Sequence, residues 1–228
     1  GDGMPNDCDV DITLHAGNNL ISFYALPDNG LDMSSFFGGS SVYQVIGQGV
    51  SSVIDNGNWV GSLQSISPED GYWVRSGLDE NDEESFEVQG GIIAPITYSI
   101  GEGSNLLSYP YSITQSLSDA IPADATDATF AIVGEGVAAT PNPVLGWVGS
   151  LSAFEGTKGY WAKVNAGFDF SYDLSSASSD RSVINEELNT PYEFTQSTQQ
   201  AFYFVEQIDA DIKIGDWILA YNDEVLVG

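Results

Sequence analysis

Residues 59–63 read WVGSL and residues 71–73 read GYW, and both strings return at 147–151 and 159–161. Each string recurs 88 positions later. Two matches at one spacing indicate an internal duplication, because chance seldom reproduces two strings at the same offset. The sequence therefore predicts two homologous domains in tandem.

The sequence upstream of these strings stays in register, with small shifts. NLIS at 19–22 matches NLLS at 105–108, and IGQGV at 46–50 matches VGEGV at 133–137. Single-residue insertions in surface loops explain the shifts, since such loops tolerate them. A unit of roughly 80 residues has the length of a small domain. We divide the chain into an Asp-rich end (1–10), β repeat 1 (11–92), β repeat 2 (93–173), a Ser-rich linker (174–189) and a partial third β module (190–228).

Short apolar runs separated by glycine-rich turns favour an all-β fold. In repeat 1 we expect strands at 11–14, 20–24, 42–46, 50–54, 59–60, 72–74 and 86–88. Asn56-Gly57 is typical of a tight hairpin turn. One short helix is expected in each repeat, at 31–37 and at 116–121, where Pro122 follows.

The sequence GNNLIS at 17–22, followed by WVGSL and GYWV, resembles the tandem β repeats of secreted bacterial and archaeal surface proteins. The resemblance covers most of residues 11–173. Asn18 and Ser104 stand where that family often has Trp. Such repeats are structural or accessory, so the resemblance implies no catalytic residues.

The first nine residues read GDGMPNDCD and resemble the end of a thrombospondin type 3 calcium repeat. The resemblance implies that Asp2, Asp7 and Asp9 are ligands of Ca²⁺. Alternating carboxylate and amide oxygens around a glycine turn suit this hard cation. The alternative interpretation is a frayed acidic terminus.

Aromatic strands are expected at 201–205 and 214–221, and Asn222-Asp223 turns into residues 224–227. This region resembles part of a β-sandwich module found near the C-termini of secreted proteins of marine bacteria. Three explanations for its short length stay open: truncation, disorder of the remainder, or completion by strands from a neighbouring subunit. The third explanation would make the chain an assembling subunit.

Acidic residues dominate the charge, with Asp+Glu 33 against Lys+Arg 5 and a net charge of −28. This balance excludes nucleic-acid binding, which needs clustered Arg and Lys. A hydrophobic content of 42% can still fill a core. No run approaches the ~20 apolar residues of a membrane span. Acidic surfaces suit salty or Ca²⁺-rich surroundings, so we expect an extracellular or cell-surface location.

Aromatic residues recur between the two copies and are candidate ligand-binding residues. They are Trp59, Tyr72 and Trp73 in repeat 1, and Trp147, Tyr160 and Trp161 in repeat 2. Two interpretations stay open: packing in the core, or stacking on sugar rings. Neighbouring strand residues point to opposite faces, so Tyr72 and Trp73 cannot both enter one core.

The sequence has few of the histidine and cysteine residues that catalytic sites commonly use. His15 is the sole histidine, and Ser99 or Ile100 falls at its place in repeat 2; Cys8 is the sole cysteine. These counts exclude a zinc site of His and Cys ligands and an internal disulfide. We therefore expect a non-enzymatic structural or assembly module of a bacterial surface protein, adhesin or filament, with copies of itself or neighbouring modules as partners. The alternative is a carbohydrate-binding accessory region of a larger secreted enzyme.

Overall fold

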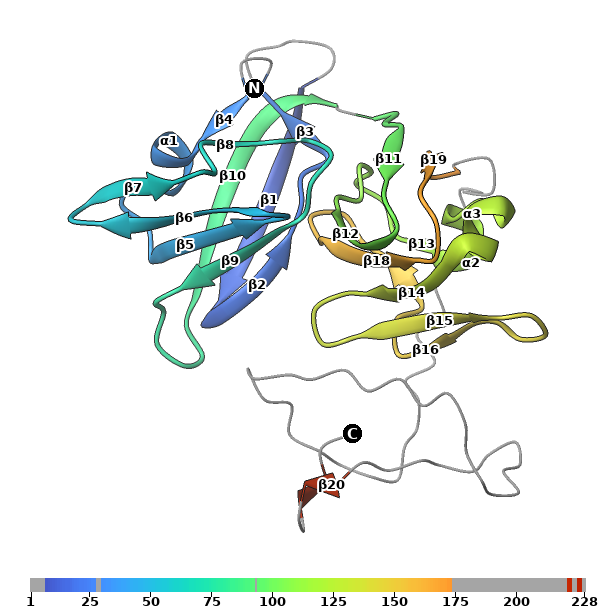
Figure 1. Cartoon of the computed structure of the whole chain (residues 1–228). Coiled ribbons are helices and arrows are strands. Elements are labelled where there is room, and N and C mark those ends of the chain that lie inside the picture. Colours follow the sequence, from blue (N-terminus) through green and yellow to red (C-terminus); the bar gives the residue numbers. More distant parts are fainter. Residues whose placement is uncertain (1–6, 28–29, 93, 174–220, 223–224, 227–228) are drawn as a thin grey trace. The chain divides into compact units, whose positions relative to one another are not determined.

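The computed structural model describes residues 7–27, 30–92, 94–173, 221–222 and 225–226 (Figure 1). Strands dominate these residues, and the helices among them are short. The predicted all-β class is therefore confirmed. Within the same ranges, no helix has the length and apolar character needed to cross a membrane.

Repeat 1 is built around a five-stranded antiparallel sheet in the order β2-β9-β5-β6-β7. The two long strands β1 and β10 pair antiparallel and form a second sheet with β3, and β4 pairs with β8. The elements are β1 (Asp7–His15), β2 (Gly17–Ile21), β3 (Ala25–Leu26), β4 (Leu31–Asp32), α1 (Met33–Phe37), β5 (Val42–Gly47), β6 (Val50–Asp55), β7 (Asn58–Gly61), β8 (Ser65–Ile66), β9 (Tyr72–Ser76) and β10 (Glu83–Ile92).

Repeat 2 has the same plan, with the five-stranded sheet in the order β12-β18-β14-β15-β16. Smaller pairs are β11 with β19 and β13 with β17. The elements are β11 (Tyr98–Ile100), β12 (Gly103–Leu107), β13 (Gln115–Ser116), α2 (Leu117–Ala120), α3 (Ala123–Ala128), β14 (Thr129–Val133), β15 (Ala138–Asn142), β16 (Gly146–Gly149), β17 (Ala153–Phe154), β18 (Tyr160–Val164) and β19 (Phe168–Phe170). The equivalent strand order matches the duplication read from the sequence.

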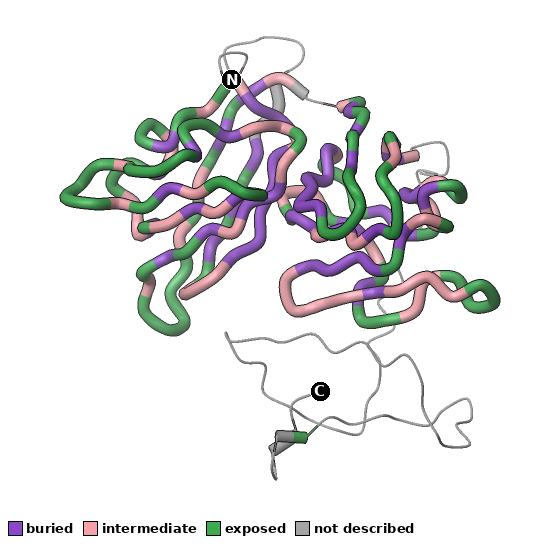
Figure 2. Tube along the Cα trace, in the orientation of Figure 1, coloured by how far each residue is buried: buried purple, intermediate pink, exposed green. Residues whose placement is uncertain are grey.

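Each repeat has its own hydrophobic core. Phe23, Phe37 and Tyr72 are buried in the core of repeat 1, and Tyr109 and Phe154 in that of repeat 2. Buried residues alternate with more exposed ones along β9 and β18, as half-buried antiparallel strands require, whereas β2 and β12 each end in three consecutive buried residues (Figure 2). One face of each five-stranded sheet therefore packs inward, and the other face points away from its own core.

Two boundaries and one helix differ from those expected. β1 begins at Asp7 and Val10 is buried opposite Val88, so the proposed boundary after residue 10 lies inside a strand. β10 begins at Glu83 and ends at Ile92, so it is longer than the strand expected at 86–88. Repeat 2 contains a second helix, because Pro122 stops α2 but also serves as the N-cap of α3.

The described residues near the C-terminus form two short paired strands. β20 (Tyr221–Asn222) pairs antiparallel with β21 (Val225–Leu226), and the expected turn residue Asp223 lies outside the described residues. The linker predicted over 174–189 and most of the module predicted over 190–228 lie outside the described residues.

Candidate functional site

The two repeats meet where the edge strand of one sheet receives a segment from the other repeat. Along β2, the Ser22 amide donates to the Thr157 carbonyl (2.8 Å) and the Gly159 amide donates to the Leu20 carbonyl (3.1 Å). Ile21 and Lys158 form an antiparallel bridge between these bonds. The segment at 157–159 therefore extends the sheet of repeat 1 by one short strand-like contact.

The same contact occurs with the roles of the repeats exchanged. Along β12, the Ser108 amide donates to the Glu69 carbonyl (3.1 Å) and the Gly71 amide donates to the Leu106 carbonyl (3.4 Å). Asp70 and Leu107 form the bridge. Because equivalent residues are used on both sides, the repeats are related as the subunits of a twofold dimer are. We call this contact the inter-repeat interface.

The inter-repeat interface covers two sheet edges that would otherwise expose unpaired backbone groups. β2 and β12 are each the terminal strand of a five-stranded sheet. Open edges invite pairing with other chains. Here each repeat covers the edge of the other, which leaves β7 and β16 as the opposite terminal strands.

Glycine in the repeated GYW string permits this close approach. A Cβ on Gly159 would lie 2.7 Å from the Ile21 carbonyl oxygen, and one on Gly71 would lie 2.8 Å from that of Leu107. Both separations are below the distances that carbon and oxygen atoms tolerate without displacement. The glycine therefore recurs because the other repeat's backbone occupies the place of a side chain.

Serine in the repeated NLIS and NLLS strings is likewise an interface residue. The Ser22 hydroxyl donates to the Lys158 carbonyl (2.6 Å) and accepts from the Tyr109 amide (3.2 Å). The Ser108 hydroxyl donates to the Pro68 carbonyl (2.7 Å). Both serines are fully buried. Their hydroxyls satisfy backbone groups that the contact removes from water.

A carboxylate and an amide complete the interface from the two hairpin tips. Glu135 Oε2 accepts from the Leu20 amide, and Gln48 Oε1 accepts from the Leu106 amide, each at 2.7 Å. Leu20 and Leu106 are buried although they lie outside both core clusters. The interface thus adds two small apolar contacts to its hydrogen bonds.

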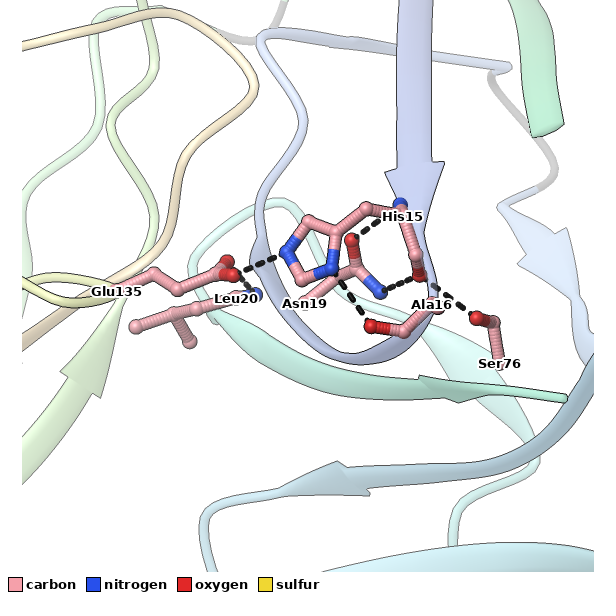
Figure 3. A network of polar contacts seen from close by, with 6 residues as sticks. All are labelled: His15, Ala16, Asn19, Leu20, Ser76 and Glu135. Atoms are coloured by element: carbon pink, nitrogen blue, oxygen red, sulfur yellow. Dashed lines mark hydrogen bonds and ion pairs between the residues drawn. The ribbon is translucent and has the colours of Figure 1, made fainter. Parts of the chain in front are cut away.

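His15 joins this network on one side only (Figure 3). Its Nδ1 lies 2.8 Å from the Ala16 carbonyl, and its Nε2 lies 2.5 Å from Glu135 Oε1. The side chain of Asn19 accepts a hydrogen bond from the His15 amide and donates one to the His15 carbonyl. The side chain of Asn105 makes the same two hydrogen bonds with Gly101. The counterpart of His15 is therefore Gly101, not Ser99 or Ile100. In this structure the sole histidine lies at the inter-repeat interface.

Two of the aromatic residues proposed to bind a ligand are core residues. Tyr72 and Tyr160 are 1% and 4% exposed. Their hydroxyls accept hydrogen bonds from the amides of Ser67 (2.7 Å) and Glu155 (2.8 Å). Burial raises the pKa of both phenols well above the usual value. Their rings are not accessible for stacking in this structure.

The tryptophans occupy two environments. Trp59 and Trp147 are half-buried and pack against the core of their own repeat; the ring centroids of Trp59 and Phe37 are 6.0 Å apart. Trp73 and Trp161 are also half-buried but alternate with buried neighbours, so they lie on the outward sheet faces. Ligand binding by these tryptophans stays a prediction.

The proposed calcium ligands are described only in part. Asp2 lies outside the described residues, whereas Asp7 and Asp9 belong to β1, with the backbone alone described. Among described residues, no group of three or more His, Cys, Asp or Glu side chains gathers as a metal site. Calcium binding at these aspartates stays a prediction.

Sequence reasoning missed the interface, although its residues were visible in the alignment of the two copies. Ser22 and Ser108 lie in the repeated strings, as do Gly71 and Gly159. Their recurrence was the available signal, but it does not reveal that they contact one another's repeats. No protein-family model, curated protein or solved structure matches the chain.

Proposed function

We propose that this chain is a non-enzymatic structural and assembly module of an extracellular bacterial surface protein, adhesin or filament. One observation carries the proposal: the duplicated residues serve to join the two repeats. The GYW glycines and the NLIS and NLLS serines make contacts between repeats.

Two repeats that are joined by hydrogen bonds suit a spacer, which must hold its shape between the parts that it separates. Relative motion would break backbone hydrogen bonds on both sides of the interface at once, and it would expose Leu20 and Leu106. Each buried group left without a partner costs about 1–3 kcal/mol. The repeats therefore resist hinge motion as one body, and this stiffness is what a surface spacer needs.

The mechanical part of this proposal is tested by pulling on single molecules of the full chain. We expect the two repeats to resist force together and to unfold in one event or in two closely coupled events. Two independent events of equal force, unchanged when the interface glycines are substituted, would contradict a joined spacer.

The assembly part rests on the strands predicted in residues 190–228. Light scattering of the intact chain during size-exclusion chromatography, with and without a calcium chelator, measures the oligomeric state directly. Ordered polymers are expected if neighbouring copies complete the partial module. A monomer under both conditions would remove assembly from the proposal while leaving the spacer role intact.

A carbohydrate-binding accessory region is the second candidate. Trp73 and Trp161 favour it, because they occupy equivalent outward positions and are not core residues. Glycan binding that is abolished by Trp73→Ala, with the fold intact, would place this candidate first.

A further inference from the structure

The outward faces of the two five-stranded sheets carry an equivalent group of three side chains. In repeat 1 the group is Tyr43, Arg75 and Trp73, and in repeat 2 it is Phe130, Lys163 and Trp161. We call each group an aromatic–cation trio. Arg75 and Trp73 lie two residues apart on β9 and therefore share a face, as do Lys163 and Trp161 on β18.

A β-bulge presents the third member of each trio. The register between β5 and β9 shifts between Val42 and Gln44, and the register between β14 and β18 shifts between Thr129 and Ala131. Tyr43 and Phe130 are the extra residues, and each is 39% exposed. Bulges often re-aim a side chain beside a functional site.

Contacts in repeat 1 show how a trio is held. The guanidinium carbon of Arg75 lies 5.5 Å from the centroid of the Tyr43 ring. The Nη1 atom of Arg75 donates to Gln44 Oε1 at 3.1 Å. The arginine is thus fixed at the surface beside an aromatic ring, where it keeps several further N–H donors.

Trp73 and Trp161 lie opposite the interface residues Leu20 and Leu106 in the strand register, so the trios border the inter-repeat interface. The four aromatic members lie outside both described core clusters, in contrast to Trp59 and Trp147. Cations are scarce, with five Lys and Arg in the chain, yet one occurs at the same position in both repeats. An exposed aromatic residue that recurs beside a cation, as Tyr43 and Phe130 do, favours a binding role.

We propose that each aromatic–cation trio is a subsite for an uncharged, extended polysaccharide. Aromatic faces stack on the apolar faces of sugar rings, and the adjacent guanidinium or ammonium donates hydrogen bonds to sugar hydroxyls. The net charge of −28 repels a polyanion. Two equivalent subsites on one joined pair of repeats favour a ligand with a repeating unit, because such a ligand gains from double attachment. This inference goes beyond the structural role proposed above and rests on the second candidate, carbohydrate binding, for which it names the ligand class and the contacting residues.

The test measures binding of the full chain to two neutral probes, cellohexaose and hydroxyethylcellulose. Calorimetry measures binding of the oligosaccharide, and affinity electrophoresis measures binding of the polymer. Tyr43→Ser and Phe130→Ser should each weaken binding of the polymer, and the double variant should weaken it about tenfold or more. Ile113→Ser with Leu145→Ser is the matched control, because both residues are exposed and apolar but lie outside the trios. The control should bind as the unmodified chain does.

Further experiments determine which chemical class of ligand the trios bind. Arg75→Lys should retain more affinity than Arg75→Gln if the cation donates to hydroxyls. Preferential binding of polygalacturonate would overturn the uncharged class. Failure of both neutral probes to bind, or equal loss in the trio and control variants, would overturn the subsites altogether. Circular dichroism and thermal unfolding of every variant ensure that lost binding is not lost folding.

Discussion

Glu135 and Gln48 make the same contact from opposite repeats: each accepts a hydrogen bond at 2.7 Å from a leucine amide on the other repeat's edge strand. The leucines, Leu20 and Leu106, are themselves equivalent. The two side chains differ in charge, but both supply an oxygen at the required place. A shared acceptor, rather than a shared charge, is therefore what the interface requires.

Glu135→Ala should lower the free energy of unfolding by about 1–3 kcal/mol, because it leaves the buried Leu20 amide without a partner. Glu135→Gln should cost less, since glutamine keeps the acceptor and reproduces the arrangement found at Gln48. Urea unfolding followed by tryptophan fluorescence measures both variants. Equal losses in the two variants would show that charge, not the acceptor, matters.

Gly159→Ala and Gly71→Ala should each destabilise the chain by roughly 1–3 kcal/mol, because the new Cβ meets a carbonyl oxygen of the other repeat. They should also reduce the cooperativity of unfolding between the repeats. Gly101→Ala is the matched control, because a Cβ there meets nothing within 4 Å. Chemical denaturation of the three variants checks this. A loss in the control as large as in the interface variants would count against the steric explanation.

Local features of the fold were predictable because they depend on neighbouring residues. Asn56 and Gly57 both adopt positive φ, 48° and 81°, as the hairpin predicted from Asn-Gly requires. The alternation of Tyr72 with Trp73 correctly predicted that only one enters the core. The repeated strings predicted two units, and both units have the same strand order.

Contacts between the repeats were not predictable in this way. Most of them use at least one backbone group, and backbone groups are the same in every residue type. Gly159 resembles any turn glycine until the carbonyl of Ile21 is placed beside it. The helix after Pro122 was missed because proline both stops one helix and begins another.

Tyr160→Phe should lower the free energy of unfolding by about 1–2 kcal/mol, because the Glu155 amide loses the hydroxyl that accepts its hydrogen bond. Tyr72→Phe should have a similar effect through the Ser67 amide. Tyr43→Phe serves as the control, because Tyr43 is exposed and its ring, not its hydroxyl, faces Arg75. Thermal unfolding of the three variants compares them directly. A control as damaging as Tyr160→Phe would show that the hydroxyl bonds are unimportant.

Alkaline pH should unfold the repeats abruptly. Burial raises the pKa of Tyr72, Tyr98, Tyr109, Tyr160 and Tyr172 above the ordinary value of 10.0 for a tyrosine. Because these phenols ionise more readily in the unfolded chain, their contribution to stability is complete below about pH 10 and falls as the pH rises further.

The loss amounts to about 1.4 kcal/mol per pH unit for each tyrosine that ionises only after unfolding, so several tyrosines together produce a steep transition. Tyrosinate absorbance and circular dichroism, recorded together during a pH titration, should change at the same pH. Replacing Tyr160 with phenylalanine removes one ionising group and should make the transition shallower. Gradual ionisation of all the tyrosines near pH 10 in a chain that stays folded would contradict the burial seen in the structure.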